Sequence, residues 1–265
     1  MRNTFFVAAL LTLAGAAAAQ QKTASDGIAE YRAMLADGNP AELFEAKGEA
    51  LWKTPRGPKN VDLQQCDLGK GPGVVKGAFV ELPRWFADTG RVQDMESRLL
   101  TCMERLQGFD AALIAKTPFG KEEQKTLESL SAWISSESRG LKFKLPQAHA
   151  EERKSYELGK RAFFYRAGSH DFSCASCHSS ADKRIRLQDL PILTKNPGDG
   201  VGFAAWPAYR VSSGELWSMQ RRLNDCYRQQ RFPYPGYASD VTIALASYMG
   251  VNAQGAVSVA PALKR

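Results

Sequence analysis

The segment CASCH, residues 174–178, constrains this chain more than any other stretch of its sequence. It has the spacing CxxCH, which is the attachment motif of c-type haem. Two thiols reach the two vinyl-derived arms of one porphyrin, and the next residue turns an imidazole onto the iron. The alternatives are a redox-active CxxC pair or half of a zinc site, but zinc would need two further ligands and none stands at a related spacing. We therefore predict one covalently bound haem c on Cys174 and Cys177, with His178 as the proximal iron ligand.

The N-terminus indicates export. Residues 1–19 combine a positive start, an apolar run of about a dozen residues and a small-residue cleavage site, which is typical of a secretory signal peptide and too short to span a bilayer. No later stretch is apolar for long enough, so we expect no membrane span and a periplasmic location. The net charge of +7 suits an anionic small molecule or an acidic protein, or only serves solubility. No nucleic-acid motif is present, and we expect no nucleic-acid partner.

The residues around CASCH predict helices. Residues 154–166 carry aromatic side chains with Gly159 at a helix-crossing position, and a second helix runs from Ser239 or Asp240 to Met249, with Gly250 as its stop. The segment between them is rich in proline and glycine and should be mostly loop. A glycine and an aromatic before CxxCH, followed by an aromatic C-terminal helix, resemble a class I cytochrome c domain.

The N-terminal half repeats intervals of the C-terminal half. In each half a glycine lies 18 residues before one cysteine, and a proline, a glycine and an arginine lie 19, 12 and four residues before another. Gly48 precedes Cys66 as Gly159 precedes Cys177. Pro83, Gly90 and Arg98 precede Cys102 at the same intervals at which Pro207, Gly214 and Arg222 precede Cys226. This set of intervals indicates duplication. The predicted fold is mainly α, with two class I cytochrome c-like domains in tandem, at residues 20–145 and 146–265.

The first copy has lost its haem site. Leu63 and Asp67 stand where the second copy has Cys174 and His178, so we expect the first domain to be degenerate and haem-less. Its two cysteines, Cys66 and Cys102, then have no porphyrin between them. In an oxidising compartment this predicts a Cys66–Cys102 disulfide, which could contribute about 4 kcal/mol by chain entropy.

Cys226 is the fifth cysteine and has no partner in the chain. We predict a helix that starts at Ser213-Gly214 and carries an apolar stripe through Tyr227, with Cys226 on its buried flank and Arg222 on the same face. Cys226 could simply fill core space. A free thiol is a liability in an oxidising space, however, and nearby arginines should favour its thiolate.

The distal iron ligand is the remaining question. The repeat places Cys226 near the iron, which makes it the favoured candidate. Met219, Met249, His149 and His170 are alternatives; a methionine would indicate ordinary electron transfer at raised potential.

The segments CASCH, RRLNDC (residues 221–226) and FPYPGY (residues 232–237) together resemble the SoxA family of the bacterial thiosulfate-oxidising Sox system, in its single-haem form. The resemblance implies a heterodimer with a SoxX-like monohaem cytochrome c, and a SoxYZ-like carrier protein whose cysteine receives thiosulfate. It also implies that Cys226 is the catalytic residue and distal ligand and that Arg222 binds substrate. Asp225 and Arg231 are neighbours, and the other arginines of the stretch should form a solvated basic rim.

Three other functions compete with this interpretation. The chain could be a periplasmic electron-transfer cytochrome c without bond-making chemistry, using Met219 or Met249 on the iron. It could be a thiosulfate dehydrogenase, which joins two thiosulfates to tetrathionate and needs no carrier protein. It could also be a haem-bearing structural subunit for a catalytic partner.

Overall fold

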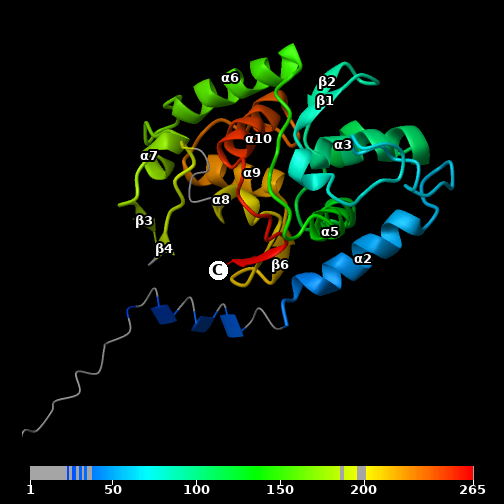
Figure 1. Cartoon of the computed structure of the whole chain (residues 1–265), viewed down its shortest axis with the longest axis horizontal. Helices are drawn as coiled ribbons and strands as arrows, with labels where there is room; N and C mark the ends of the chain where they lie inside the picture. Colours follow the sequence, from blue (N-terminus) through cyan, green and yellow to red (C-terminus); the bar gives the residue numbers. More distant parts are fainter. Residues whose placement is uncertain are drawn as a thin grey trace, which may run out of the picture.

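The computed structural model describes residues 23, 26–27, 30–31, 33–34, 38–185, 188–195 and 201–264. Helices dominate these residues, which confirms the mainly α prediction (Figure 1). The helices are α2 (Ala41–Lys53), α3 (Met95–Cys102), α4 (Ala111–Lys116), α5 (Glu122–Ser136), α6 (Ala150–Phe164), α7 (Cys174–His178), α8 (Val201–Ala204), α9 (Met219–Gln229) and α10 (Asp240–Asn252), with a 3-10 turn η1 (Phe79–Glu81) and a π-helical segment η2 (Met103–Gln107). The expected signal peptide lies outside the described residues.

Short strands complete the fold. They are β1 (Arg84–Phe86), β2 (Arg91–Gln93), β3 (Arg184–Ile185), β4 (Gln188–Asp189), β5 (Ala208–Arg210), β6 (Glu215–Trp217) and β7 (Ala262–Lys264). Three antiparallel hairpins join β1 to β2, β3 to β4 and β5 to β6, and β7 lies parallel to β5. No helix among the described residues is both long enough and apolar enough to cross a membrane.

Two helix pairs cross at glycines. Helix α2 packs on α5, and helix α6 packs on α10 (Figure 1). A Cβ added to Gly48 of α2 would lie 2.0 Å from the Ser129 carbonyl oxygen, and one added to Gly159 of α6 would lie 1.9 Å from the Ala244 carbonyl oxygen. Only glycine allows backbones to approach this closely. The two glycines that the sequence pairs by interval therefore make the same kind of contact.

A hairpin followed by a capped helix occurs in both halves. Gly90 and Gly214 close the β1–β2 and β5–β6 turns with φ of +64° and +66°, a conformation that favours glycine. Asp94 then caps α3 and Ser218 caps α9 through their side-chain oxygens. The expected helix start at Ser213-Gly214 is therefore wrong, because residues 215–217 pair as a strand and the helix begins only at Met219.

The helices around CASCH have nearly the expected bounds. Helix α6 covers residues 150–164, and α10 begins at Asp240 after Ser239, whose hydroxyl accepts from the Thr242 amide. Gly250 does not end α10, which continues to Asn252. A Cβ on Gly250 would lie 2.5 Å from the Leu145 side chain, so this glycine serves a close packing contact instead.

One apolar core extends through both halves of the chain. Phe143 meets Phe79 of the N-terminal half and Phe203 of the C-terminal half, both edge to face with centroids 5.4 Å apart. The same cluster of buried side chains contains Trp52 and Leu130 as well as Leu245. The division at residues 145 and 146 stays a prediction, because no break in packing marks it.

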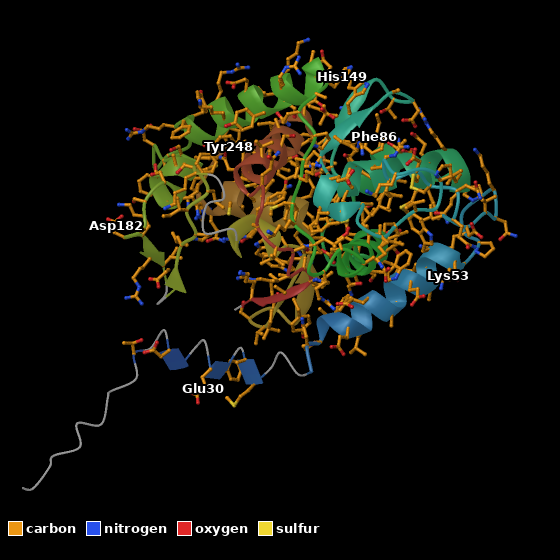
Figure 2. The ribbon with its side chains drawn as sticks, in the orientation of Figure 1. Glu30, Lys53, Phe86, His149, Asp182 and Tyr248 are labelled. Carbon is orange, nitrogen blue, oxygen red and sulfur yellow. A yellow bond between two sulfur atoms is a disulfide. The ribbon has the colours of Figure 1, made fainter. Side chains whose placement is uncertain are left out.

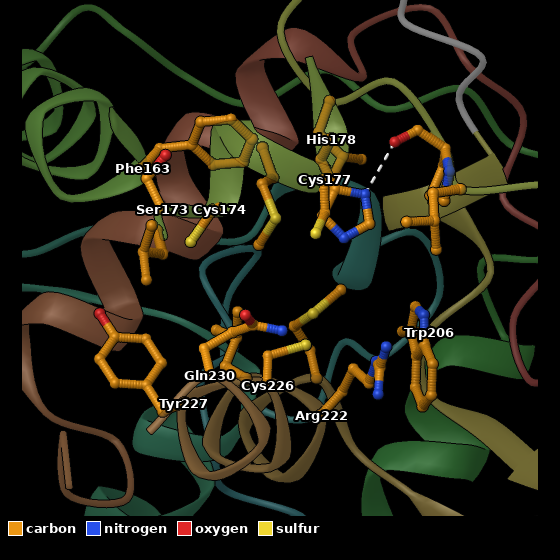
Figure 3. A pocket seen from close by; sticks show the side chains of 18 of the residues that line it. Phe163, Ser173, Cys174, Cys177, His178, Trp206, Arg222, Cys226, Tyr227 and Gln230 are labelled. Atoms are coloured by element: carbon orange, nitrogen blue, oxygen red, sulfur yellow. Dashed lines mark hydrogen bonds between the residues drawn. The ribbon is translucent and has the colours of Figure 1, made fainter. Parts of the chain in front are cut away.

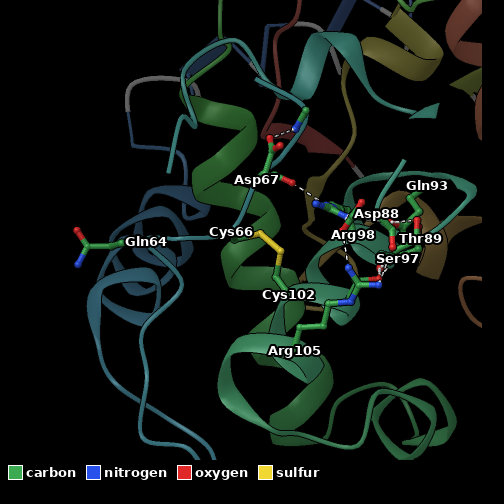
Figure 4. The surroundings of a disulfide bond; sticks show 12 residues. Gln64, Cys66, Asp67, Asp88, Thr89, Gln93, Ser97, Arg98, Cys102 and Arg105 are labelled. Atoms are coloured by element: carbon green, nitrogen blue, oxygen red, sulfur yellow. Dashed lines mark hydrogen bonds and ion pairs between the residues drawn. A yellow bond between two sulfur atoms is a disulfide. The ribbon is translucent and has the colours of Figure 1, made fainter. Parts of the chain in front are cut away.

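The disulfide predicted in the N-terminal half is present. Cys66 and Cys102 are bonded, with Cα atoms 5.5 Å apart, and both are buried (Figure 4). Arg98, one turn before Cys102, stacks on the Phe86 ring and donates to both carboxylate oxygens of Asp88 at 2.9 Å. An ion pair and a cross-link thus fill this part of the N-terminal half.

Candidate functional site

A cavity of about 370 Å³ lies between α7, α9 and α10 (Figure 3). The lining is largely apolar and aromatic, and a few polar and charged side chains point into it. The lining residues are Phe163, Ser173, Cys174, Cys177, His178, Asp189, Leu190, Pro191, Leu193, Gly202, Trp206, Arg210, Met219, Arg222, Leu223, Cys226, Tyr227, Gln230, Phe232, Leu245, Met249 and Lys264. An apolar cavity with few convergent polar groups is typical of a cofactor site.

Helix α7 is the CASCH segment itself. Its start is fixed by a reciprocal cap, in which the Ser173 hydroxyl accepts from the Ser176 amide and the Ser176 hydroxyl accepts from the Ser173 amide. The helical spacing places Cys174 and Cys177 on one face, since residues three apart are neighbours on a helix. Both line the cavity, as does His178 at the end of the helix (Figure 3).

The His178 imidazole is held in one orientation. Its Nδ1 lies 2.8 Å from the Pro191 carbonyl oxygen (Figure 3). A carbonyl oxygen can only accept, so the hydrogen is on Nδ1 and the lone pair is on Nε2. A second bond of this kind fixes the tautomer and raises the basicity of a metal-ligating histidine.

Helix α9 supplies the opposite wall. Cys226 and Arg222, one turn apart, both face the cavity, with the sulfur of Cys226 across the open space from the His178 ring (Figure 3). The Arg222 guanidinium donates to Asp225 at 3.1 Å and lies 5.8 Å from the centre of the Trp206 ring. The structure therefore brings together the two α9 residues that the sequence singled out and the three of CASCH.

Two thiols of the cavity, Cys226 and Cys174, favour their neutral forms. Burial raises the pKa of Cys226, and the charges of Arg222 and Arg210 offset this only in part. The expectation that the arginines would favour a thiolate is thus not met by the free thiol, because desolvation outweighs them. Burial also raises the pKa of Cys174 to about 12. A bonded metal would change this balance, since the thiolate is the form that binds it.

The alternative distal ligands separate into two groups. Met219 and Met249 line the cavity. His149 instead caps α6 (Figure 2) and stacks on Trp85 with ring centroids 4.3 Å apart, and His170 packs against Phe172; neither lines the cavity. The geometry leaves Cys226 and the two methionines as candidates.

The donor set fits a haem better than zinc. Two thiols on one helical face, an oriented imidazole beside them and a large apolar cavity match the needs of a c-type porphyrin. Among the residues that the structure describes, no group of three or more His, Cys, Asp and Glu side chains could hold a metal ion by itself. The half-zinc-site alternative therefore has no partner ligands within that part of the chain.

The sequence has a close curated relative. The L-cysteine S-thiosulfotransferase subunit SoxA of Hydrogenophilus thermoluteolus is 52% identical over 273 aligned residues, which cover 100% of both chains. This chain belongs to the SoxA family. A SoxA of Hydrogenobacter thermophilus is 30% identical, again over 100% of both chains. The crystal structure of SoxXA from P. pantotrophus shares the fold, with a TM-score of 0.73 at 22% identity over 89% of this chain and 84% of that one.

The family model that matches is the SoxA/TsdA cytochrome c domain, at residues 47–143. A cytochrome c domain implies haem c. The matched range lies in the half of this SoxA-family chain that has no CxxCH motif.

One arginine of α9 was misjudged from the sequence. Arg221 is not part of a solvated rim: it is buried, donates to Glu128 at 2.8 Å and also pairs with Glu215. Arg228 and Arg231 are exposed as expected, and Arg228 donates to Asp225 at 2.6 Å. Asp225 thus accepts from Arg222 and Arg228 together.

Other cavity residues of this SoxA-family chain were not foreseen. Arg210 and Lys264 come from β5 and β7, which pair in parallel, and Trp206 and Gln230 come from loop and helix-end positions. Lys264 lies 38 positions after Cys226, so only the β5–β7 pairing brings it to the cavity. No local signal in the sequence announces that pairing.

Proposed function

We propose that this chain is a haem-bearing subunit of an L-cysteine S-thiosulfotransferase, which joins thiosulfate to a cysteine thiol of a SoxYZ-like carrier protein. The observation that carries the proposal is that Cys226 and Arg222 line one cavity with Cys174, Cys177 and His178. The curated relatives carry that enzyme name.

The overall reaction balances as an oxidation. A carrier thiol and thiosulfate lose one proton and two electrons and form one sulfur–sulfur bond, which gives a cysteine S-thiosulfonate. A haem held by Cys174, Cys177 and His178 would supply a nearby electron acceptor for this oxidation. Because one haem takes one electron at a time, a second acceptor is required, and a monohaem cytochrome c partner is the natural one. The related structure is titled SoxXA, in keeping with such a partner.

Arg222 supplies positive charge for the substrate, and Cys226 supplies a reactive sulfur. The fork of donors and fixed charge on Arg222 suit the thiosulfate dianion, and Trp206 and Asp225 hold that guanidinium at the cavity. Cys226 offers the sulfur to which thiosulfate bonds as two electrons and one proton leave. The carrier thiol then attacks the sulfur that bears the sulfonate, the bond to Cys226 breaks, and the carrier's proton restores the Cys226 thiol. We assign Cys226 as the catalytic residue and the distal ligand, and Arg222 as the substrate-binding residue.

We infer that the chain holds one covalent haem c and is two cytochrome c-like units in tandem. The match of a cytochrome c domain to residues 47–143 supports a degenerate first unit, since Asp67 stands there in place of a histidine ligand. The Cys66–Cys102 disulfide also favours it, because it joins the positions that the repeat equates with Cys177 and Cys226. Export to the periplasm stays a prediction.

Substitution of Cys226 tests the assignment. We expect Cys226→Ala to keep covalent haem, shown by haem staining on a denaturing gel and by mass, while conjugation to the carrier is lost and the Soret band shifts. Met219→Leu and Met249→Leu are matched controls in the same cavity and should leave the spectrum unchanged. An active Cys226→Ala protein with an unchanged spectrum would refute the assignment.

An electron-transfer cytochrome is the second candidate, because both methionines line the cavity. It predicts that Met219→Leu or Met249→Leu, rather than Cys226→Ala, alters the Soret band. Product analysis with and without carrier protein separates the third possibility, since a tetrathionate-forming dehydrogenase needs no carrier.

A further inference from the structure

The first turn of α9 is held by side chains from the N-terminal half. Gln220 is fully buried, and its backbone amide donates to Glu96 at 3.1 Å. Its side-chain amide nitrogen donates to Asp94 at 2.6 Å, and its side-chain oxygen accepts from the Ala238 amide at 3.0 Å. Each polar group of this side chain thus has a partner in another element.

Arg221 contacts side chains of both halves. Its guanidinium donates to Glu128 of α5 at 2.8 Å, and it also pairs with Glu215 of β6. The same group lies 4.6 Å from the centre of the Trp217 ring and 5.4 Å from that of Phe119. The side chain of Glu128 is only 2% exposed, so this is a buried charge pair.

A buried ion pair is a costly way to pack α9 against the N-terminal half. Removing two charges from water costs several kcal/mol for each ion, and an apolar pair of similar volume is often at least as stable. Directional hydrogen bonds and ion pairs from two sides fix the rotation and the axial position of a helix more closely than apolar packing does. Arg222 directly follows Arg221, and Cys226 lies one turn further along the same rigid helix.

We propose that Asp94, Glu96 and Glu128 are positioning residues for the reaction site, acting through Gln220 and Arg221 to set where Arg222 and Cys226 stand in the cavity. We call these five residues the α9 latch. The inference rests on the proposed function and assigns a task to the half without a CxxCH motif. A displacement of about 1 Å by a change remote from the chemistry can cost 100-fold in rate, so the latch should be visible in kinetics.

The experiment must distinguish positioning of the reaction site by the α9 latch from a general contribution of the same contacts to stability. Glu128→Gln removes the charge that Arg221 faces while keeping the side-chain shape. Asp88→Asn is the matched control, since Asp88 also pairs with a buried arginine of the N-terminal half, Arg98, but its ion pairs are with Arg98 and Arg105 rather than with α9. Both variants should lower the melting temperature. Only Glu128→Gln should move the reaction site.

The experiment uses the haem-loaded chain with its cytochrome partner. We expect Glu128→Gln to lower kcat/KM for thiosulfate about tenfold or more, to shift the Soret band and to speed amide hydrogen exchange over residues 219–229. Asp88→Asn should leave all three at wild-type values. If Glu128→Gln does not fold, Arg221→Lys, which keeps the charge but loses the fork, serves as the second variant.

Two outcomes would overturn the latch. One is unchanged kinetics, spectrum and α9 exchange in Glu128→Gln. The other is an equal loss in Asp88→Asn at a similar melting temperature, which would show general destabilisation. Hydrogen exchange and the spectrum need no turnover, so a chain that fails the Cys226→Ala test can still pass this one.

Discussion

Arg221 and Arg222 are consecutive residues of α9, yet their guanidinium groups serve different parts of the molecule. Arg221 is buried against Glu128 and Glu215, whereas Arg222 lines the cavity beside Cys226. Successive helical residues point about 100° apart, so neighbours in sequence can belong to different environments. One turn of helix therefore joins the core of the N-terminal half to the cavity.

Arg222→Ala should chiefly raise the thiosulfate concentration that the enzyme needs. Loss of the guanidinium removes the fixed charge for the dianion, so we expect KM for thiosulfate to rise about tenfold or more, in line with a charged hydrogen bond of roughly 1.5–3 kcal/mol. Steady-state kinetics at varied thiosulfate measures it. Arg228→Ala is the matched control, because Arg228 also pairs with Asp225 but is exposed. Unchanged thiosulfate kinetics in Arg222→Ala would refute the role.

Removal of the disulfide should destabilise the chain without changing the haem spectrum. Cys66→Ala with Cys102→Ala opens a loop whose closure contributes about 4 kcal/mol by chain entropy. The urea midpoint of unfolding reports the loss, and non-reducing peptide mapping of the wild type confirms the bond. Because the two sulfurs lie outside the cavity lining, the Soret band should not move. An unchanged midpoint would contradict the expected contribution.

Much of this organisation could be read from the sequence where signals are local or repeated. CASCH, the Ser239 cap of α10 and the glycine crossings depend on residues close in sequence or on equal intervals, and the disulfide followed from those intervals. The start of α9 could not be read in this way. Leu216 continues an apolar stripe at helical spacing, but pairing with β5 makes it part of a strand.

The partners of the buried polar and charged side chains of α9 could not be predicted either, because they lie far away in the sequence. Arg221 meets Glu128 across 93 positions of chain, and Gln220 meets Glu96 across 124. A single sequence does not show such long-range contacts, so Arg221 is predicted from it to be one more exposed arginine. The neutral state of the Cys226 thiol was also missed, because its pKa depends on burial that only the folded chain shows.

Stability should fall as the pH rises through neutrality. Burial raises the pKa of Glu96 to about 8, and the adjacent Asp94 charge adds to this rise. In an unfolded chain a glutamate carboxyl titrates near pH 4.3. The folded state thus binds more protons, so this contribution is full below the unfolded pKa and is lost as pH rises through about 8.

Glu96→Gln should flatten that dependence. Glutamine resembles the protonated carboxyl and does not titrate, so the fall in melting temperature between about pH 5 and pH 9 should become smaller. The groups that face Glu96 are Asp94, Gln220, Ser218 and Tyr237, and the pKa of Tyr237 is raised well above its usual value by burial. Glu123→Gln, on an exposed position of α5, is the control and should leave the slope unchanged. An unaltered slope in Glu96→Gln would argue against the assignment.

Alanine at either crossing glycine should destabilise the chain, but the two should disturb the cavity to different extents. A Cβ on Gly159 would lie 1.9 Å from the Ala244 carbonyl oxygen, and one on Gly48 would lie 2.0 Å from that of Ser129. The backbones must separate, and overpacking of this kind costs about 1–3 kcal/mol. Gly38→Ala, where nothing lies within 4 Å of the added Cβ, is the control for both.

The two variants differ in what they displace. Helices α6 and α10 contribute Phe163, Leu245 and Met249 to the cavity lining, whereas α2 and α5 contribute none of the residues that line it. Gly159→Ala should therefore lower the melting temperature and shift the Soret band clearly, while Gly48→Ala should shift the band less, because it reaches the cavity only indirectly, through Glu128 beside Ser129 on α5. Thermal unfolding and absorption spectra of the haem-loaded variants measure both effects. A Soret shift of equal size in both variants would mean that the cavity responds to general loosening of the core. The α6–α10 crossing would then affect the cavity no more than the α2–α5 crossing does.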